Sequence, residues 1–313
     1  MEGAMTTQQN EQDRAARVSK RAPGRGSHRI AAEDPRERLL AAMPVTERRL
    51  ELAGVSTAVL EGGEGPPVVL LHGPGAYAAH WMRVIPGLVA THRVVAPDLP
   101  GHGASQVRDG APDAARVLAW LGELVQSTCT SPPTLVGQLL GGAIAARFAI
   151  DQGHRLRRLV LVDAFGLAEF RPAPEFAQAL GQFLAQPNED THEGLWRHCA
   201  FDLDALRLEM GELWEPFEAY NLERARMPSV KAAFAILMEE LGVRAIPSSD
   251  LARIAVPTTL VWGRHDIATL DIAQAASARY GWPLHVIENA ADDPPIEQPE
   301  ALLRALRAAF ERG

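Results

Sequence analysis

The chain has few lysines, no long apolar run and no excess of positive charge, and each shortage excludes a class of protein. Lysine occurs only as Lys20 and Lys231, and the formal net charge of −8 argues against a nucleic-acid partner, because neutralising phosphates requires a basic surface. No apolar run reaches the roughly 18 residues of a membrane-spanning helix. The N-terminus lacks the apolar stretch of a secretory signal. We therefore expect a cytoplasmic protein whose partner is neither a membrane nor a nucleic acid.

Cysteines and cofactor motifs are equally sparse. The two cysteines, Cys129 and Cys199, have no CxxC spacing, which favours two free thiols over a disulfide in a reducing compartment. The chain contains no Walker loop and no metal-ligand spacing such as HExxH. The sequence therefore predicts no cofactor and no metal, and leaves a small molecule as the expected ligand. It leaves the oligomeric state open.

The length and the N-terminal composition set the domain organisation. A chain of 313 residues suffices for one large α/β domain, or for a core domain that carries an inserted subdomain. Residues 1–33 are polar, rich in glycine and arginine, and lack a helical or strand period. This composition predicts a disordered tail, with a basic interaction arm as the alternative.

Beyond the tail, short continuous apolar runs recur, as in parallel strands that are buried on both faces. The runs are Val68–Leu71, Val94–Ala96, Thr134–Val136, Leu159–Val162, Thr259–Trp262 and His285–Ile287. Helical stretches are predicted at Pro35–Met43, Ala78–Ala90, Ala114–Ser127, Gly142–Gln152, Ile272–Tyr280 and Pro299–Glu311. An alternating hairpin pattern, Arg48–Leu52 and Val55–Leu60, precedes the first run. The alternation of strands and helices predicts an α/β fold with a doubly wound, mostly parallel sheet.

One gap interrupts this alternation. Between Asp163 and Val256 there is no strand run, only helical material rich in Phe, Leu and Trp. A segment of that length is not a structureless loop in a compact domain. We expect a helical cap at residues 165–250, inserted into a core made of residues 34–164 and 251–313.

Five motifs in sequence order carry a family resemblance. They are His72-Gly73-Pro74-Gly75, Asp98–Ser105, Val136–Gly142, Gly263-Arg264-His265-Asp266 and Glu297-Gln298-Pro299-Glu300. Together they resemble the α/β-hydrolase superfamily over about residues 46–311. The resemblance implies that superfamily's sheet, with a cap above the active site.

The resemblance also implies a catalytic triad, and two of its three positions are substituted here. The nucleophile stands at the centre of a G-x-S-x-G turn, and Leu139 occupies that position between Gly137 and Gly141. Leucine has no lone pair with which to attack a carbonyl. The family histidine lies five residues before the Glu-Gln-Pro sequence, where this chain has Asp292. Only the acid, Asp266, matches, so ordinary serine-esterase activity is not expected.

The remaining site positions allow more than one interpretation. Asp266 is either a relic that accepts hydrogen bonds from loop amides or, with Asp292, a carboxyl pair that shares a proton and serves as acid and base or binds a cation. Backbone donors of the family's oxyanion site would persist despite side-chain changes. The expected ligand-binding residues are His72, Gly73, Pro74, Gly75, Ala76, Leu139 and Leu140.

Other polar residues near the motifs are expected to be structural. Three histidines, His80, His102 and His265, are expected in loops or on the surface, because no nucleophile pairs with them in the sequence. Asp98 and Ser105 are expected to hold their loop by side chain–backbone hydrogen bonds. Leu139 is expected at positive φ if its turn keeps the family geometry.

Three functions from different classes remain open on the sequence alone. The first is a non-hydrolytic or atypical family member that binds a small apolar or carbonyl-bearing molecule under the cap. The second is a hydrolase or lyase with relocated catalytic groups, namely Asp266, Asp292 or a nearby histidine. The third is a regulatory protein that docks through its N-terminal arm. The fold alone does not choose among them.

Overall fold

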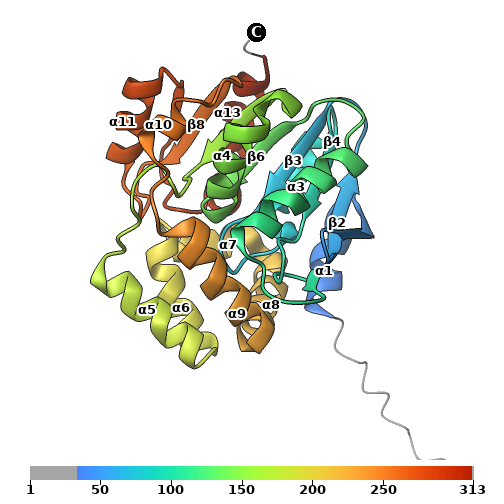
Figure 1. Ribbon diagram of the computed structural model, residues 1–313. Coiled ribbons are helices and arrows are strands. Elements are labelled where there is room, and N and C mark those ends of the chain that lie inside the picture. Colours follow the sequence, from blue (N-terminus) through green and yellow to red (C-terminus); the bar gives the residue numbers. More distant parts are fainter. Residues whose placement is uncertain (1–33, 312–313) are drawn as a thin grey trace, which may run out of the picture. The chain divides into compact units, whose positions relative to one another are not determined.

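The computed structural model describes residues 34–311, which form a mostly parallel sheet flanked by helices (Figure 1). The strand order is β1-β2-β4-β3-β6-β7-β8-β9, and β5 pairs with β2. The strands are β1 Thr46–Leu52, β2 Val55–Gly62, β3 Pro67–Leu71, β4 Arg93–Pro97, β5 Gln106–Val107, β6 Thr134–Gln138, β7 Arg158–Val162, β8 Thr258–Gly263 and β9 Leu284–Ile287. Every predicted apolar run falls in a strand, and the predicted hairpin is the antiparallel pair of β1 and β2.

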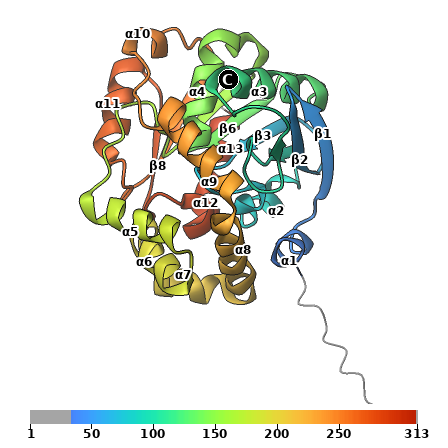
Figure 2. The same ribbon diagram turned by 60° about the horizontal axis from the view of Figure 1, so that its bottom comes forward.

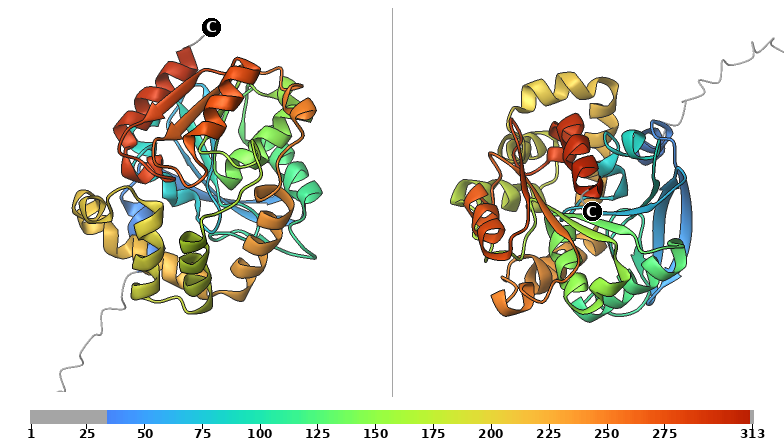
Figure 3. Two further views of the ribbon diagram at one scale, coloured as in Figure 1. Left: turned by 90° about the vertical axis from the view of Figure 1, so that its left-hand side faces the viewer. Right: turned by 90° about the horizontal axis from the view of Figure 1, so that it is seen from above.

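Both faces of the sheet are buried, which explains why its strands are continuously apolar. Along β3, Val69 and Leu71 pack on one side, and Val68 and Leu70 on the other. Figure 3 shows the sheet between two helical layers. The first face carries α3 Ala114–Thr128, α4 Leu140–Gln152 and α11 Leu270–Tyr280, and the second carries α1 Pro35–Ala41, α2 Ile85–Leu88 and α13 Pro299–Glu311. The predicted α/β fold class is confirmed.

The segment between β3 and β4 differs from the single helix predicted at Ala78–Ala90. It forms a 3₁₀ turn, η1 (Ala78–Trp81), and then the one-turn helix α2. Pro86 lies in the first turn of α2, where its missing N–H is tolerated, whereas inside a longer helix it would remove a hydrogen bond. The carboxylate of Asp98 accepts a hydrogen bond from the Ala78 N–H at 2.6 Å, which anchors the start of η1.

The loop after β4 is held by its polar side chains, as predicted. Asp98 also accepts a hydrogen bond from the Ala104 N–H at 2.7 Å. The Ser105 hydroxyl donates to the Asp98 carbonyl at 2.8 Å and accepts from the Ala58 N–H at 3.0 Å. Arg36 of α1 lies 3.0 Å from the Asp98 carboxylate. These contacts tie the first described helix to the loop beside the sheet.

Only helices and turns lie between β7 and β8 in the described chain. The helices are α5 Pro174–Ala185, α6 Glu189–Cys199, α7 Leu203–Met210, α8 Trp214–Arg226, α9 Pro228–Leu237 and α10 Ser248–Leu251. Helices α5 to α9 gather at one end of the sheet (Figures 1 and 2). The division into a core of 34–164 and 251–313 with a cap at 165–250 stays a prediction.

Two further observations concern the limits of the described chain. The tail predicted at residues 1–33, and the docking arm proposed for it, lie outside the described residues. Each helix within residues 34–311 is too short or too polar to cross a lipid bilayer.

Candidate functional site

The turn from β6 into α4 places Leu139 in a strained conformation. Its backbone has φ 46° and ψ −111°, a region that costs a non-glycine residue about 1–3 kcal/mol. The Leu139 N–H donates to the Val162 carbonyl at 3.0 Å. A Cβ atom on Gly141 would lie 2.5 Å from the Leu71 carbonyl oxygen, and one on Gly137 would lie 2.3 Å from the Gly141 carbonyl oxygen. The turn is therefore too tightly packed to relax, and Leu139 has the positive φ expected from the sequence.

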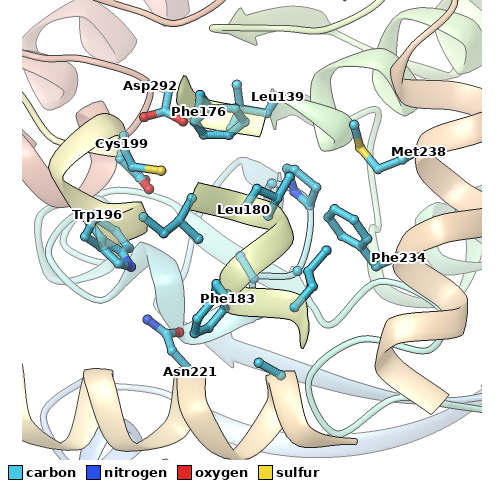
Figure 4. A pocket seen from close by; sticks show the side chains of 18 of the residues that line it. Leu139, Phe176, Leu180, Phe183, Trp196, Cys199, Asn221, Phe234, Met238 and Asp292 are labelled. Atoms are coloured by element: carbon cyan, nitrogen blue, oxygen red, sulfur yellow. The ribbon is translucent and has the colours of Figure 1, made fainter. Parts of the chain in front are cut away.

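Leu139 lies on the wall of a pocket of about 160 Å³. Figure 4 shows the pocket lined mainly by apolar side chains of the helices between β7 and β8. These include Phe176, Leu180, Phe183, Trp196, Phe234 and Met238. Engineered apolar cavities of about 150 Å³ accommodate benzene. The pocket can therefore hold a molecule with about one aromatic ring or a short acyl chain.

The structure brings only part of the predicted ligand-binding loop to this pocket. Gly73, Pro74, Gly75 and Ala76 line the pocket. His72 is fully buried, with Nδ1 2.8 Å from the Gly73 carbonyl oxygen and Nε2 accepting a hydrogen bond from a loop N–H at 3.0 Å. Burial holds the pKa of His72 well below its ordinary value, so the ring is neutral. His72 therefore supports the loop from behind.

Leu140 also lies outside the pocket wall. Its side chain is fully buried in the core between α4 and the sheet. Of the two leucines expected at the base of the pocket, Leu139 alone lines it in the described structure. A leucine at the first position of α4 is explained by core packing alone.

Asp292 is the polar group most deeply placed in the pocket wall. Its side chain is 4% exposed, and Oδ1 has no hydrogen-bond partner among residues 34–311. Burial raises the pKa of Asp292 well above its ordinary value, and the charges of Asp293, Asp266 and Glu297 raise it further. Asp292 is therefore a neutral carboxylic acid near neutral pH in the free protein.

Asp266 is buried in the packed interior behind this wall. Its Oδ1 accepts a hydrogen bond from the Ala268 N–H at 3.1 Å, while Oδ2 has no partner within the described chain. Burial raises the pKa of Asp266 to about 7. Its amide contact is the one expected of a structural relic, and its charge interacts with that of Asp292 as expected of a carboxyl pair.

Two further acids extend this cluster. Asp163, at the end of β7, accepts a hydrogen bond from the Gly263 N–H at 2.7 Å, and burial raises its pKa well above the ordinary value. Glu297 accepts hydrogen bonds from the N–H groups of Ala291 and Phe201, and burial raises its pKa to about 7. Among the described residues, no three His, Cys, Asp or Glu side chains converge as a metal site would require.

Sequence reasoning missed a polar network beside Leu139. His80 Nε2 lies 2.7 Å from Asp293 Oδ1, and Gln138 Nε2 donates to the same oxygen at 2.9 Å. All three residues line the pocket. The expectation that His80 is a loop or surface residue is therefore wrong, because η1 places it in the interior at 5% exposure. No local motif pairs residues more than 200 positions apart, so only the fold reveals the network.

The other predicted residues have simpler surroundings. His102 is buried in the loop after β4, with Nδ1 3.2 Å from the Pro100 carbonyl oxygen, and His265 is exposed and stacks on Phe201. Cys129 and Cys199 are both free. Cys199 lines the pocket, and burial raises its pKa well above the ordinary value, so it is a neutral thiol.

Comparison with known proteins adds to this geometry. The alpha/beta hydrolase family model matches residues 68–305. The pimeloyl-[acyl-carrier protein] methyl ester esterase of Aeromonas salmonicida (strain A449) is 30% identical over 269 residues, which cover 81% of this chain and 98% of the esterase. The 2-hydroxy-6-oxo-2,4-heptadienoate hydrolase of Pseudomonas putida is 32% identical over 228 residues, covering 70% of this chain and 79% of the enzyme.

A solved structure is similar over nearly the same length. The 2-hydroxy-6-oxo-6-phenylhexa-2,4-dienoate hydrolase from Rhodococcus sp. strain RHA1 aligns with a TM-score of 0.74 at 25% identity. The alignment covers 86% of this chain and 99% of the hydrolase. The sheet and the helices between β7 and β8 therefore have counterparts among hydrolases.

Proposed function

This chain belongs to the alpha/beta hydrolase family, and we propose that it is a member without ordinary serine-hydrolase chemistry that binds a small apolar or carbonyl-bearing molecule under its helical cap. The observation that carries the proposal is Leu139, which stands on the strained turn at the pocket wall where the family has its nucleophile. An aliphatic side chain cannot form a covalent intermediate. In the histidine position, a buried and neutral Asp292 cannot accept a proton as imidazole does.

The pocket supports a binding function despite these substitutions. Its wall is mostly aromatic and aliphatic, as in small-molecule sites generally. The loop of Gly75 and Ala76 borders it, where backbone N–H groups can donate to a carbonyl oxygen. The similar proteins are named as an esterase and as oxo-dienoate hydrolases. These names describe carbonyl-bearing substrates, which agrees with a carbonyl-bearing ligand here.

A second candidate, a hydrolase or lyase with relocated catalytic groups, is favoured by one contact. His80 and Asp293 form a pair of 2.7 Å at the pocket wall, and His80 Nδ1 has no partner within residues 34–311. A histidine oriented by a carboxylate is the arrangement that activates water as a general base. Turnover by the wild type that His80→Gln abolishes would favour this candidate.

Hydrolysis of p-nitrophenyl esters of short and medium chain length tests the leading proposal. We expect no turnover by the wild-type protein above the rate of Leu139→Ala. The double variant Leu139→Ser, Asp292→His should hydrolyse the esters, because it restores a nucleophile and a base on an existing turn. Leu139→Ser alone is the matched control that lacks the base. Wild-type turnover lost in Asp266→Asn or His80→Gln would overturn the proposal.

A further inference from the structure

One end of the pocket presents polar atoms that lack partners. Gln138 Oε1 and Asp292 Oδ1 have no hydrogen-bond partner within residues 34–311, and these side chains are 1% and 4% exposed. An amide oxygen is an acceptor only. His80 Nδ1 is likewise without a partner in that range, and it is an acceptor when the neutral ring donates from Nε2 to Asp293. A buried acceptor without a partner is costly, so this end of the pocket requires a donor from the ligand.

The charge around these atoms has one sign. The carboxyl groups that surround Asp292 are Asp163, Asp266, Asp293 and Glu297. Apart from burial, the influences that raise the pKa of Asp292 are negative charges, and no arginine or lysine lowers it. The lysine in the pocket wall, Lys231, donates to the Leu184 carbonyl at 2.6 Å. A positive group on the ligand would therefore meet uncompensated acceptors.

We propose that the pocket binds a small apolar amine, with its ammonium group against Asp292 and Gln138 Oε1. The inference rests on the proposed function, because it needs the pocket to hold a small molecule. The ammonium supplies several N–H donors to acceptors that have none, and its charge is opposite to that of the cluster. The apolar body then lies against Phe176 and Leu180, which Figure 4 shows beside the end formed by Asp292, Leu139 and Cys199.

Binding of an ammonium group is coupled to proton release. In the free protein Asp292 holds a proton, because burial and neighbouring acids raise its pKa. A cation next to the carboxyl group lowers that pKa, so the complex contains a carboxylate and the proton leaves to solvent. Affinity for the amine therefore increases with pH until the amine itself loses its charge. The titratable groups that face Asp292 are Asp266, Asp293, Glu297, Cys199 and His80.

Calorimetric titration of the full-length protein with three ligands of one size tests the inference. The ligands are benzylamine, benzyl alcohol and benzoate, at pH 6 and pH 8. We expect benzylamine to bind about tenfold or more tightly than benzyl alcohol, because hydrogen bonds to charged groups exceed neutral ones. Benzylamine affinity should increase from pH 6 to pH 8, whereas benzyl alcohol affinity should not. Titration in buffers of different ionisation enthalpy should show release of close to one proton per amine.

The variant Asp292→Asn separates the charge from the shape of the pocket. It should bind benzyl alcohol as the wild type does, which also shows that it is folded, but lose the preference for benzylamine and the proton release. Asp151→Asn, at an exposed position, is the matched control and should behave as the wild type.

The outcomes distinguish this inference from the proposed function. Equal binding of benzylamine and benzyl alcohol, or tighter binding of benzoate, would overturn the amine assignment and leave the binding function standing. Failure of all three ligands to bind would overturn both. The proton count decides the question from the wild type alone if Asp292→Asn does not fold.

Discussion

Gln138 and Asp293 join the two segments that a triad would need to bring together. The Gln138 amide, directly before the strained turn, donates to Asp293 Oδ1 at 2.9 Å and to the Asp292 carbonyl at 3.0 Å. Asp293 also contacts His80. One glutamine side chain therefore holds the loop after β9 against the turn that carries Leu139. The orientation of Asp292 at the pocket depends on this link.

Replacing Gln138 should measure the strength of the link. We expect Gln138→Leu to lower the free energy of unfolding by about 1–2 kcal/mol, because Asp293 loses a buried donor while the unpaired Oε1 is removed as well. Urea denaturation monitored by tryptophan fluorescence gives the value. The control is Gln274→Leu on the exposed side of α11, which should change stability by less than about 0.5 kcal/mol. Equal effects of the two substitutions would contradict the role of the link.

Strain at Leu139 predicts an unusual ranking of two truncations. Leu139→Gly and Leu139→Ala remove the same packing, but only glycine adopts φ 46° and ψ −111° without steric cost. The glycine variant should therefore be more stable than the alanine variant by about 1 kcal/mol. At Leu208, which is 85% exposed in α7, alanine should be more stable than glycine by about 1 kcal/mol. The same ranking at both positions would show that Leu139 carries no strain.

The sequence predicts the sheet well because each strand has a local signal. Buried parallel strands are continuously apolar, and the glycines of the turns are needed where a Cβ would collide, so the motifs locate β3, β6 and the strained turn. Contacts between distant segments have no such signal. The pairing of His80 with Asp293 depends on how η1 meets the loop after β9. For the same reason, nothing in the motif around His72 predicts that its side chain faces away from the pocket.

Packing at the turn also predicts opposite effects of one substitution at two glycines. A Cβ on Gly141 would lie 2.5 Å from the Leu71 carbonyl oxygen and 2.7 Å from that of His72, and neither backbone group can move without disturbing β3. Gly141→Ala should cost about 3 kcal/mol or more. Gly181 lies in α5, and a Cβ added there would meet nothing within 4 Å, so Gly181→Ala should stabilise by about 0.5–1 kcal/mol through helix propensity. Thermal unfolding of both variants decides this, and a tolerated Gly141→Ala would refute the close packing.

The buried acids make the stability of the protein depend on pH. Burial raises the pKa of Asp266 from 3.8 to about 7 in the folded chain. Between those values the folded state binds more protons than the unfolded state, so the free energy of unfolding falls as pH rises from about 4 to about 7. For Asp266 the full loss is on the order of 4 kcal/mol.

Asp266→Asn tests this dependence directly, because asparagine keeps the acceptor for the Ala268 N–H and removes the titration. The variant should be more stable than the wild type at pH 8, and the difference should shrink towards pH 4.5. Asp163, Asp292 and Glu297 still titrate in the variant, so its profile should become shallower without becoming flat. Urea denaturation at several pH values gives both profiles. Parallel profiles would mean that Asp266 is ionised in the folded protein across this range, and that the acids around the pocket do not share protons as described.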